Sequence, residues 1–546
     1  MENWNIAYTL TQVADQQPDR TALVTKAIGG YRHWTFRDLA EHCSAYAHGL
    51  AARGIGPGDR AVLMVTPSME FITLTFALFR LGTSVILIDP GMGYRNLLRC
   101  IHRVEPTAFI GIPKAQLFRL LNPGHFRSVR QVICVGFNPG FLGDSLAGLA
   151  DFHRGAYPTL ATKQDDQAAI IFTTGSTGPP KGVVYSHGNF QAQLDQIRNY
   201  YGITPQDVDQ PAFPLFGLFS TALGASAVIP SMNPAHPARV NPARFIQSII
   251  DHRVTFSFGS PAIWRVVSRY CVQKGIVLDS LRLVLMAGAP VPGELIERVR
   301  KILPEDALIH TPYGATESLP TTSIDSSEIM EKTWPLSRQG KGTCVGRPLP
   351  GIDVKIIEPS DQPIDDWTAV KERPEGSVGE IVVRGAVVTR AYFNNEEETR
   401  LAKISDLTDG FWHRMGDLGY LDDRQRLWFC GRKAHRVEAA GGTMYTIPCE
   451  AIFNEHPKVR RSALVGIRMP RQKSVVPVLI AEPRGRVNSK RLLAELNDLA
   501  QTNSLTRPIH HFLIHPNFPV DIRHNAKIFR EKLALWAQEQ LAGEDG

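Results

Sequence analysis

The chain has 546 residues, of which 43% are hydrophobic and 21% charged, the balance of an ordinary globular protein of more than one domain. Its net charge of +7 comes from scattered basic residues, so it favours anionic small ligands and excludes nucleic-acid binding as the main function. Seven cysteines without CxxC pairs exclude a disulfide framework and a zinc site, and they predict a cytoplasmic location.

The most apolar segment, residues 71–88, is too interrupted to cross a membrane. Spanning a bilayer needs about 20 nearly unbroken apolar residues, and Arg80, Gly82 and Thr83 break this run. We interpret it as a helix followed by a buried strand. The first twenty residues carry acidic groups and no apolar core, which excludes a signal peptide. We therefore predict no transmembrane segment.

Short β-branched runs alternate with helical patterns through the first four hundred residues. The runs predict strands at 60–65, 84–88, 108–111, 131–135, 168–172, 254–258 and 281–286. Apolar residues recurring at three and four predict helices at 35–53, 68–81 and 242–252. Strands that alternate with helices predict an α/β fold, with parallel sheets covered by helices on both faces.

The pattern changes in the last two hundred residues. Short strands at 354–357, 379–384 and 427–429, with Gly, Pro and Asp turns between them, indicate a small β-rich subdomain. The polar stretches 360–376 and 392–409 predict surface loops. Beyond residue 432 a compact α+β pattern follows, with strands at 463–467, 475–481 and 511–514 and a helix at 489–502. We predict an N-terminal domain at 1–432 and a C-terminal domain at 433–546.

A loop rich in glycine and hydroxyl groups follows the predicted strand at 168–172. It reads TTGSTGPPKG, and its spacing differs from that of a Walker loop. Glycines let backbone N–H groups approach an anion closely, and hydroxyls add further donors. Lys181 supplies a mobile positive charge. The loop therefore predicts a phosphate site, formed by Thr173, Thr174, Gly175, Ser176, Thr177, Gly178 and Lys181.

TTGSTGPPKG resembles the phosphate-loop signature of the adenylate-forming enzymes, which include acyl-CoA synthetases, peptide-synthetase adenylation domains and luciferases. Further motifs resemble those of this family in order and spacing, and together they span nearly the whole chain. The resemblance implies ATP and Mg²⁺ as cofactors, and a large N-terminal domain followed by a small mobile C-terminal domain. It also implies that the loop holds the two phosphates that leave as pyrophosphate.

The segment YGATE at 313–317 resembles the family's adenine and magnesium segment, with Gly314 and Ala315 in its middle. Glu317 offers a hard carboxylate oxygen suited to Mg²⁺, and Thr316 offers a hydroxyl for phosphate. Tyr313 has an aromatic ring that can stack on a purine. A second segment, Gly288, Ala289 and Pro290, follows an apolar strand and resembles the loop that closes over adenine.

Three charged residues nearer the C-terminus resemble further family motifs. Asp417, in the segment GDL, matches the aspartate that binds ribose, since a carboxylate can accept from both ribose hydroxyls. Arg432, in the pair GR, matches the start of the inter-domain hinge near ribose or phosphate. Lys527, in NAKIFR, matches the lysine that neutralises charge between the carboxylate and the α-phosphate. The resemblance makes Lys527, with Glu317, the leading catalytic candidate.

One apparent motif is rejected. The segment LGDSL at 142–146 resembles a phosphopantetheine attachment site. A carrier domain needs its own helical bundle around that serine, and the N-terminal α/β pattern leaves no room for one. We interpret the segment as a loop that leads into a helix.

Three positions depart from the common family pattern. Gly217 stands where many acyl-CoA synthetases carry a histidine, Ala434 replaces a polar hinge residue, and Ala526 replaces a glycine. With these departures the chain resembles one branch, the β-lactone synthetases of bacterial long-chain olefin biosynthesis. That resemblance implies a long-chain 2-alkyl-3-hydroxy acid as substrate, whose 3-hydroxyl displaces AMP from the acyl-adenylate. It also implies other enzymes of the olefin pathway as partners.

The sequence leaves two assignments with alternatives: the residues that line the acyl pocket, and the base that deprotonates the 3-hydroxyl. The apolar segment with Phe216, Gly217 and Phe219 can line an acyl pocket or belong to the core. His435 can deprotonate the hydroxyl or serve only the hinge, and the hinge role is the better interpretation. A long-chain acyl-CoA ligase shares every ATP motif, and a non-catalytic acyl-nucleotide sensor is the third alternative. Gly217 is expected to leave space for an alkyl branch.

Overall fold

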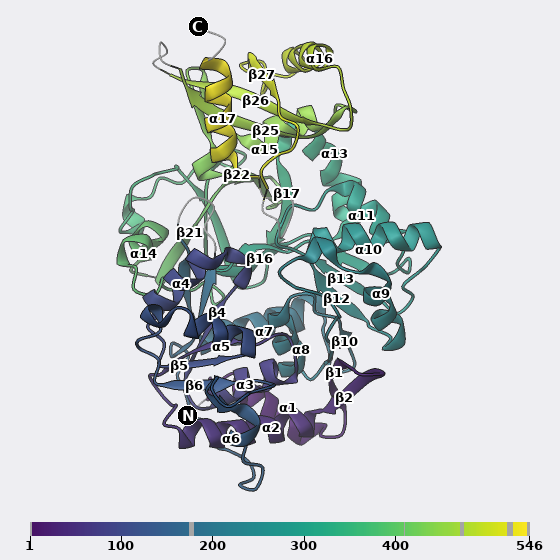
Figure 1. Ribbon diagram of the computed structural model, residues 1–546. Helices are drawn as coiled ribbons and strands as arrows, with labels where there is room; N and C mark the ends of the chain where they lie inside the picture. The colour runs from purple at the N-terminus through teal and green to yellow at the C-terminus, as the bar shows by residue number, and fades with distance from the viewer. Residues whose placement is uncertain (1–2, 174–178, 409, 470–473, 521–527, 543–546) are drawn as a thin grey trace.

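The computed structural model describes residues 3–173, 179–408, 410–469, 474–520 and 528–542 (Figure 1). Within these residues the strands form four sheets. In Figure 1 the sheet formed by strands between residues 437 and 514 lies at one end of the molecule with helices α15 (Thr446–Asn454), α16 (Ser489–Gln501) and α17 (Arg530–Ala542). Helices α1 (Ala7–Gln16) and α2 (Phe36–Ala52) lie at the other end. This arrangement confirms the predicted α/β fold.

Two seven-stranded sheets organise the N-terminal part of the chain. The first has the order β7-β6-β5-β3-β4-β8-β9, parallel except for the antiparallel pair β8 and β9. Its strands are β3 (Arg60–Met64), β4 (Ser84–Ile88), β5 (Ala108–Gly111), β6 (Gln131–Cys134), β7 (Asp144–Ser145), β8 (Gln167–Thr173) and β9 (Lys181–Ser186). The predicted parallel strands therefore end in an antiparallel hairpin at one edge.

The second sheet has the order β14-β13-β12-β10-β11-β1-β2, parallel except for the hairpin of β1 and β2. Its strands are β1 (Thr21–Ala27), β2 (Gly30–Thr35), β10 (Val208–Asp209), β11 (Ser226–Val228), β12 (Phe256–Gly259), β13 (Leu283–Met286) and β14 (Leu308–His310). The carboxyl ends of its parallel strands meet at one edge of the sheet, where ligands bind in open α/β sheets.

The remaining two sheets come later in the chain. An antiparallel sheet contains β15 (Tyr313–Ala315), β16 (Ser318–Ser323), β17 (Thr343–Pro348), β18 (Ile352–Ile357), β19 (Gly379–Gly385), β20 (Lys403–Asp406), β21 (Gly410–Leu421) and β22 (Leu427–Arg432). A mixed sheet contains β23 (Val437–Ala439), β24 (Gly442–Met444), β25 (Val459–Arg468), β26 (Val475–Pro483) and β27 (His511–Ile514). The predicted division of the chain at residue 432 remains a prediction.

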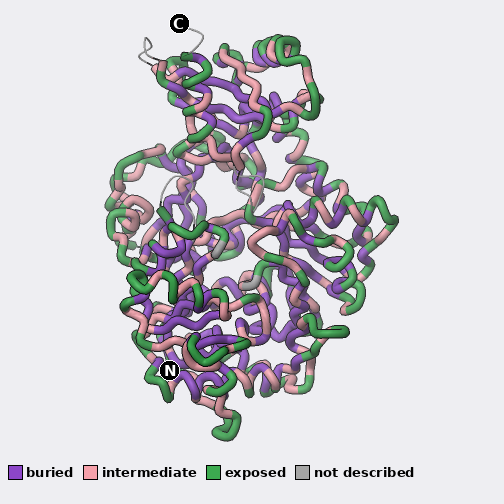
Figure 2. Tube along the Cα trace, in the orientation of Figure 1, coloured by how far each residue is buried: buried purple, intermediate pink, exposed green. Residues whose placement is uncertain are grey.

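Helices cover the sheets. They are α1 (Ala7–Gln16), α2 (Phe36–Ala52), α3 (Met69–Arg80), α4 (Tyr94–Val104), α5 (Pro113–Leu120), α6 (Leu146–Leu149), α7 (His187–Tyr201), α8 (Pro214–Ala222), α9 (Pro242–Asp251), α10 (Pro261–Lys274), α11 (Gly293–Arg300), α12 (Ser326–Glu328), α13 (Trp334–Leu336), α14 (Glu396–Ala402), α15 (Thr446–Asn454), α16 (Ser489–Gln501) and α17 (Arg530–Ala542). Figure 2 shows buried residues concentrated along the strands between these helices.

Strand β3 shows why the central strands read as unbroken apolar runs. Ala61 and Leu63 belong to one buried core and Val62 to another, so both faces of the strand are covered. Helix α2 begins where the sequence predicts, because Thr35 and Asp38 form a reciprocal cap. Burial of both sheet faces and local capping therefore account for the correct strand and helix predictions.

The prediction of a surface loop at 392–409 is wrong. Residues Glu396–Ala402 form α14 and Lys403–Asp406 form β20, which pairs with β21. Asn395 caps the helix by accepting a hydrogen bond from the backbone of Glu398. Tyr392, just before the helix, is buried. The polar composition of this stretch reflects ion pairs and a helix N-terminus rather than an irregular loop.

The sequence also predicts that the cysteines form no disulfide framework and that the chain has no transmembrane segment. All seven cysteines are free thiols and buried. No helix in the described residues has the length and apolar character that crossing a bilayer requires.

Asp209 is a buried acid, and the raised pKa of its carboxyl group makes the stability of the fold depend on pH. It is 0% exposed, one oxygen accepts from Ser220 Oγ at 2.5 Å, and the other accepts no hydrogen bond from the described residues. Burial raises the pKa of Asp209 to about 8. Between pH 4 and 8 the folded chain thus keeps a proton that the unfolded chain releases, so stability falls as pH rises.

We expect Asp209→Asn to remove this dependence. The melting temperature of the variant should exceed that of the wild type by about 5 °C at pH 8, and the difference should shrink at pH 5. Thermal unfolding at both pH values measures the effect. Asp279→Asn, at an exposed position, is the matched control and should behave like the wild type at both. The same difference in melting temperature between Asp209→Asn and the wild type at pH 5 and at pH 8 would contradict the raised pKa of Asp209.

Candidate active site

The predicted phosphate loop joins two paired strands. Strand β8 ends at Thr173 and β9 begins at Lys181, and these two residues are register partners in the antiparallel pair. The predicted loop residues Thr174, Gly175, Ser176, Thr177 and Gly178 lie outside the described residues. The structure therefore places the two ends of the loop and the lysine that follows it.

Lys181 is held by two groups from the segment around α14. Its Nζ lies 2.5 Å from Glu398 Oε2 and 5.2 Å from the centroid of the Tyr392 ring. Both charged side chains are about one-quarter to one-third exposed. Lys181 is therefore a partly exposed cation whose partner in this structure is a carboxylate, and a phosphate that takes the place of this carboxylate would suit the same charge.

Glu317 and Thr316 form the tip of the hairpin between β15 and β16. Glu317 Oε1 accepts a hydrogen bond of 2.6 Å from Tyr392 Oη. The backbone oxygen of Thr316 accepts from Tyr185 Oη at 2.5 Å, and that of Glu317 accepts from the Thr389 backbone at 2.9 Å. Tyr392 therefore links the neighbourhoods of Lys181 and Glu317, which are far apart in sequence.

A half-buried lysine, Lys403, lies close to this carboxylate. Burial lowers the pKa of Lys403 to about 7, while Glu317 acts in the opposite direction. The Lys403 ammonium donates to the Thr389 backbone oxygen and lies 5.3 Å from the Phe411 ring centroid. The carboxylate of Glu317 thus lies near Lys403, and it accepts a hydrogen bond from the same Tyr392 whose ring lies beside Lys181.

Tyr313, Asp417 and Arg432 form a second polar cluster, assembled from β15, β21 and β22. Tyr313 Oη donates to Asp417 Oδ2 at 2.6 Å, and Arg432 Nη1 lies 2.9 Å from Asp417 Oδ1 in an ion pair. Burial raises the pKa of Asp417, and Arg432 and the Tyr313 hydroxyl oppose that shift. Asp417 Oδ1 is buried and accepts no aligned hydrogen bond from the described residues, so the ion pair with Arg432 is its principal electrostatic contact among them.

The hairpin that carries Tyr313 requires glycine in its middle. A Cβ at Gly314 would lie 2.3 Å from the Ser318 backbone oxygen, which no side chain tolerates. The next residue, Ala315, pairs with Ser318. Gly314 therefore lets the strand fold back tightly and present Thr316 and Glu317 at the tip.

Gly288, Ala289 and Pro290 follow β13 at the carboxyl edge of the second sheet. Strand β14 is parallel to β13, and its end leads through His310 to Tyr313. Gly288 has φ +89°, a conformation that favours glycine. The loop and the Tyr313 hairpin therefore start from neighbouring strand ends, which brings together two segments that the sequence predicts at one site.

The predicted acyl segment is the helix α8. Phe216 stacks on Phe258 of β12, with ring centroids 3.6 Å apart and planes 9° apart, and Phe219 packs edge-on against Phe216 at 5.7 Å. Gly217 is buried, and a Cβ there would lie 3.3 Å from Ile72 Cδ1. In this structure the missing side chain allows α8 to approach Ile72 of α3.

Lys527 lies outside the described residues, but the contacts that follow it in the chain are described. Arg530 makes a bidentate ion pair with the buried Glu450, at 2.6 and 2.9 Å. His435, in the hinge, contacts Glu531 Oε1 through Nε2 at 3.1 Å. Burial lowers the pKa of His435. Because Nε2 is already engaged, this contact favours the hinge role of His435.

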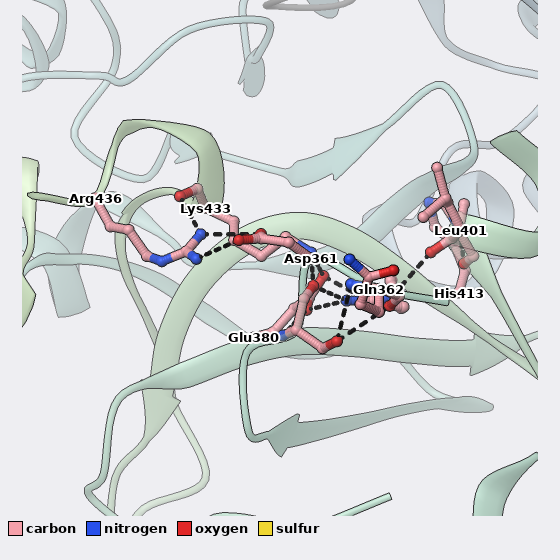
Figure 3. Close-up of polar contacts among 10 residues, drawn as sticks. Asp361, Gln362, Glu380, Leu401, His413, Lys433 and Arg436 are labelled. Carbon is pink, nitrogen blue, oxygen red and sulfur yellow. Dashed lines mark hydrogen bonds and ion pairs between the residues drawn. The ribbon is translucent and has the colours of Figure 1, made fainter. Parts of the chain in front are cut away.

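A buried ion network joins the hinge to the antiparallel sheet (Figure 3). Glu380 pairs with Arg414 at 2.7 Å and with Lys433 at 2.9 Å, and its side chain is 1% exposed. Arg436, on the other side of Ala434, pairs with Asp361 at 2.6 Å. The charged residues around Ala434 therefore have partners in the antiparallel sheet and its loops.

Sequence reasoning missed Tyr392, Glu398, Tyr185 and Lys403. One local signal was present for α14, because Asn395 followed by three glutamates is typical of a helix N-terminus. For Tyr392 no local signal exists, since its partner Glu317 lies 75 residues away.

A scan against known families matches residues 10–393 to the family described as AMP-binding enzyme. An olefin beta-lactone synthetase from Xanthomonas campestris pv. campestris is 44% identical over 98% of both chains. Among solved structures, an amide bond synthetase from Marinactinospora thermotolerans has a TM-score of 0.79 at 21% identity, covering 97% of this chain and 99% of the other. O-Succinylbenzoate coenzyme A synthetase from Bacillus subtilis, in complex with ATP and magnesium ion, has a TM-score of 0.74 at 23% identity, covering 98% and 99%.

Proposed function

The chain belongs to the AMP-binding enzyme family and is an AMP-forming ligase, and from that premise we propose that its substrate is a long-chain 2-alkyl-3-hydroxy acid. ATP first converts the carboxylate to an acyl-adenylate and releases pyrophosphate. The 3-hydroxyl of the same substrate then displaces AMP and closes a β-lactone. The relative named olefin beta-lactone synthetase supports the lactone-forming step, and the convergence of Lys181 and Glu317 on Tyr392 supports the adenylation step.

The phosphate and metal roles follow from charge and position. We assign the β- and γ-phosphates of ATP to the loop 173–178 and to Lys181, whose Nζ already holds an anion in Glu398. Glu317 offers one carboxylate, and Mg²⁺ is commonly bound by one or two carboxylates together with substrate phosphates. The residues present therefore fit Mg²⁺, which would neutralise phosphate charge. Thr316 and Lys527 are assigned to the α-phosphate and the reacting carboxylate.

The nucleoside roles use the second polar cluster. We assign Asp417 to the ribose hydroxyls, since a carboxylate can accept from both, and the ion pair with Arg432 opposes the rise in the pKa of Asp417 that burial causes. Tyr313 lies at a strand end beside the loop of Gly288, Ala289 and Pro290, and we assign these residues to adenine. Gly314 and Ala315 shape the hairpin that carries them.

The second step needs no other substrate. The hydroxyl oxygen attacks the activated carbonyl carbon, the bond from that carbon to the AMP oxygen breaks, and the hydroxyl proton passes to a base. An internal nucleophile held within reach gains the kinetic advantage of an intramolecular reaction, and the energy stored in the mixed anhydride drives closure of the strained four-membered ring. We assign the acyl chains to the aromatic surface of α8 with Phe216 and Phe219, where Gly217 allows close packing.

The setting of the reaction is part of the proposal. Seven buried free thiols fit a reducing compartment, so we place the protein in the cytoplasm. The β-lactone is the reactive product that a further enzyme of olefin formation has to receive, and such enzymes are the proposed partners.

Product analysis tests this function. The purified protein is incubated with a long-chain 2-alkyl-3-hydroxy acid, ATP and Mg²⁺, with and without CoA, and the products are identified by mass spectrometry. We expect β-lactone, AMP and pyrophosphate in equal amounts without CoA. AMP release from a plain fatty acid that requires CoA would identify a long-chain acyl-CoA ligase instead. Absence of pyrophosphate exchange with every carboxylic acid would identify a non-catalytic sensor.

A further inference from the structure

The ion pair between Lys181 and Glu398 occupies the lysine that we assign to phosphate. The distance from Nζ to Oε2 is 2.5 Å, and the lysine side chain is 25% exposed. Glu398 is the third of three consecutive glutamates in the first turn of α14. Glu396 and Glu397 are exposed and form no ion pair with any described residue. The contact is therefore specific to one position of an acidic run.

Backbone contacts connect the segment before Glu398 to the strand that carries Lys181. The Phe393 backbone donates to Gly182 O at 2.7 Å, and the Val184 backbone donates to Ala391 O at 3.1 Å. Thr399 Oγ1 accepts from the Tyr392 backbone at 3.0 Å, which ties α14 to the same segment. Glu398 therefore has a defined place relative to Lys181, unlike a surface carboxylate that reaches a lysine by chance.

The pair has a consequence for any anion that binds Lys181. A lysine ammonium is a compact charge, and a triphosphate that approaches Nζ has to displace or share the space of the carboxylate beside it. The carboxylate also repels the phosphate, because like charges in a partly buried site interact strongly. Both effects disfavour the bound triphosphate and the bound pyrophosphate.

We propose that Glu398 is an internal counter-anion that holds Lys181 when the site is empty and competes with the pyrophosphate portion of ATP. This inference rests on the proposed function, which assigns Lys181 to the β- and γ-phosphates. Glu398 is then a positioning residue: it keeps the lysine ordered and near Tyr392 before ATP arrives, and it promotes release of pyrophosphate after adenylation. Glu398 therefore raises the KM for ATP and takes no part in the chemical step.

The test compares Glu398→Gln with Glu397→Gln. Each variant removes one negative charge from the same helical turn. The two variants therefore change the long-range electrostatic potential at the site by a similar amount, and they differ in the direct contact with Lys181. Isothermal titration calorimetry measures binding of inorganic pyrophosphate with Mg²⁺, and ATP–pyrophosphate exchange measures KM and kcat. We expect Glu398→Gln to tighten pyrophosphate binding and lower the KM for ATP by about two- to fivefold, as expected for loss of one partly exposed ion pair. Glu397→Gln should match the wild type.

Other outcomes separate this inference from the function on which it rests. Equal pyrophosphate affinities and equal KM values for ATP in Glu398→Gln, Glu397→Gln and the wild type would overturn the role of Glu398. Weaker pyrophosphate binding by a Glu398→Gln protein of unchanged melting temperature would overturn it as well. Should Glu398→Gln fail to fold, Glu398→Asp, with a shorter reach to Nζ, should show the same tightening. Lys181→Ala should weaken pyrophosphate binding at least tenfold; without that loss, the phosphate assignment itself is wrong.

Discussion

Replacing Glu317 by glutamine is expected to lower ATP–pyrophosphate exchange by about 100- to 1000-fold, which corresponds to about 2.7–4 kcal/mol of transition-state stabilisation. Glutamine has the shape of glutamate and can still accept the hydrogen bond from Tyr392, so the hairpin tip should keep its structure. What it loses is the negative charge that Mg²⁺ requires from a carboxylate ligand. Initial rates of exchange at saturating substrate provide the measurement.

The control for this variant is its own stability and its response to metal. Its melting temperature should remain within about 2 °C of the wild type, since the side chain lies at the tip of a hairpin. Half-maximal exchange should require a higher Mg²⁺ concentration. Exchange within threefold of the wild type at ordinary Mg²⁺ concentration would show that another residue holds the metal.

Replacing Glu380 by alanine is expected to have the largest effect on stability, a loss of about 3–5 kcal/mol. Arg414 and Lys433 would then lose the carboxylate that neutralises them. Arg414 is 2% exposed, so its charge could not regain water without unfolding of the sheet. It would keep only the backbone oxygens of Ser360, Gln362 and Leu401 as acceptors. Figure 3 shows Glu380, Lys433 and Gln362 within this network of polar contacts.

The chain offers a matched control for this change. Glu358, which follows β18, pairs with Lys371 at 3.7 Å, and both side chains are more than half exposed. Glu358→Ala should cost less than about 1 kcal/mol. We expect Glu380→Ala to lower the melting temperature by about 5–10 °C and Glu358→Ala by about 2 °C or less. A shift for Glu380→Ala no larger than that of the control would show that Arg414 finds other partners.

The network of Glu380 also bears on the hinge. Lys433 and Arg436 flank Ala434, and both pair with residues of the antiparallel sheet or its loops. The first of these pairs is buried and the second has an exposed aspartate. Rotation of the predicted C-terminal domain about the predicted hinge would break the Arg436–Asp361 pair at less cost than the Lys433–Glu380 pair, because the Asp361 side chain is 65% exposed and that of Glu380 only 1%. The pivot is therefore expected to lie after Lys433.

Local patterns in the chain determined much of the fold. Strands such as Ser84–Ile88 and Ala108–Gly111 were predicted with their observed bounds, because burial on both sheet faces requires an unbroken apolar run. The helix at 35–53 was predicted within one residue at each end, because its cap is local. Motif resemblance selected Glu317, Asp417 and Arg432, since such motifs are contiguous stretches of chain.

Tertiary structure alone decided how these segments meet. Nothing near Tyr392 in the sequence shows that its hydroxyl reaches Glu317, or that Glu398 reaches Lys181, because both contacts connect strands and helices more than 70 residues apart. The polar stretch 392–409 was predicted to be a loop from its composition, although Asn395 and the three glutamates that follow it are typical of a helix N-terminus. Sequence thus determined which groups the site contains, since local spacing encodes motifs, caps and buried strands. The fold decided which of them touch, since contacts between distant segments depend on how the sheets pack.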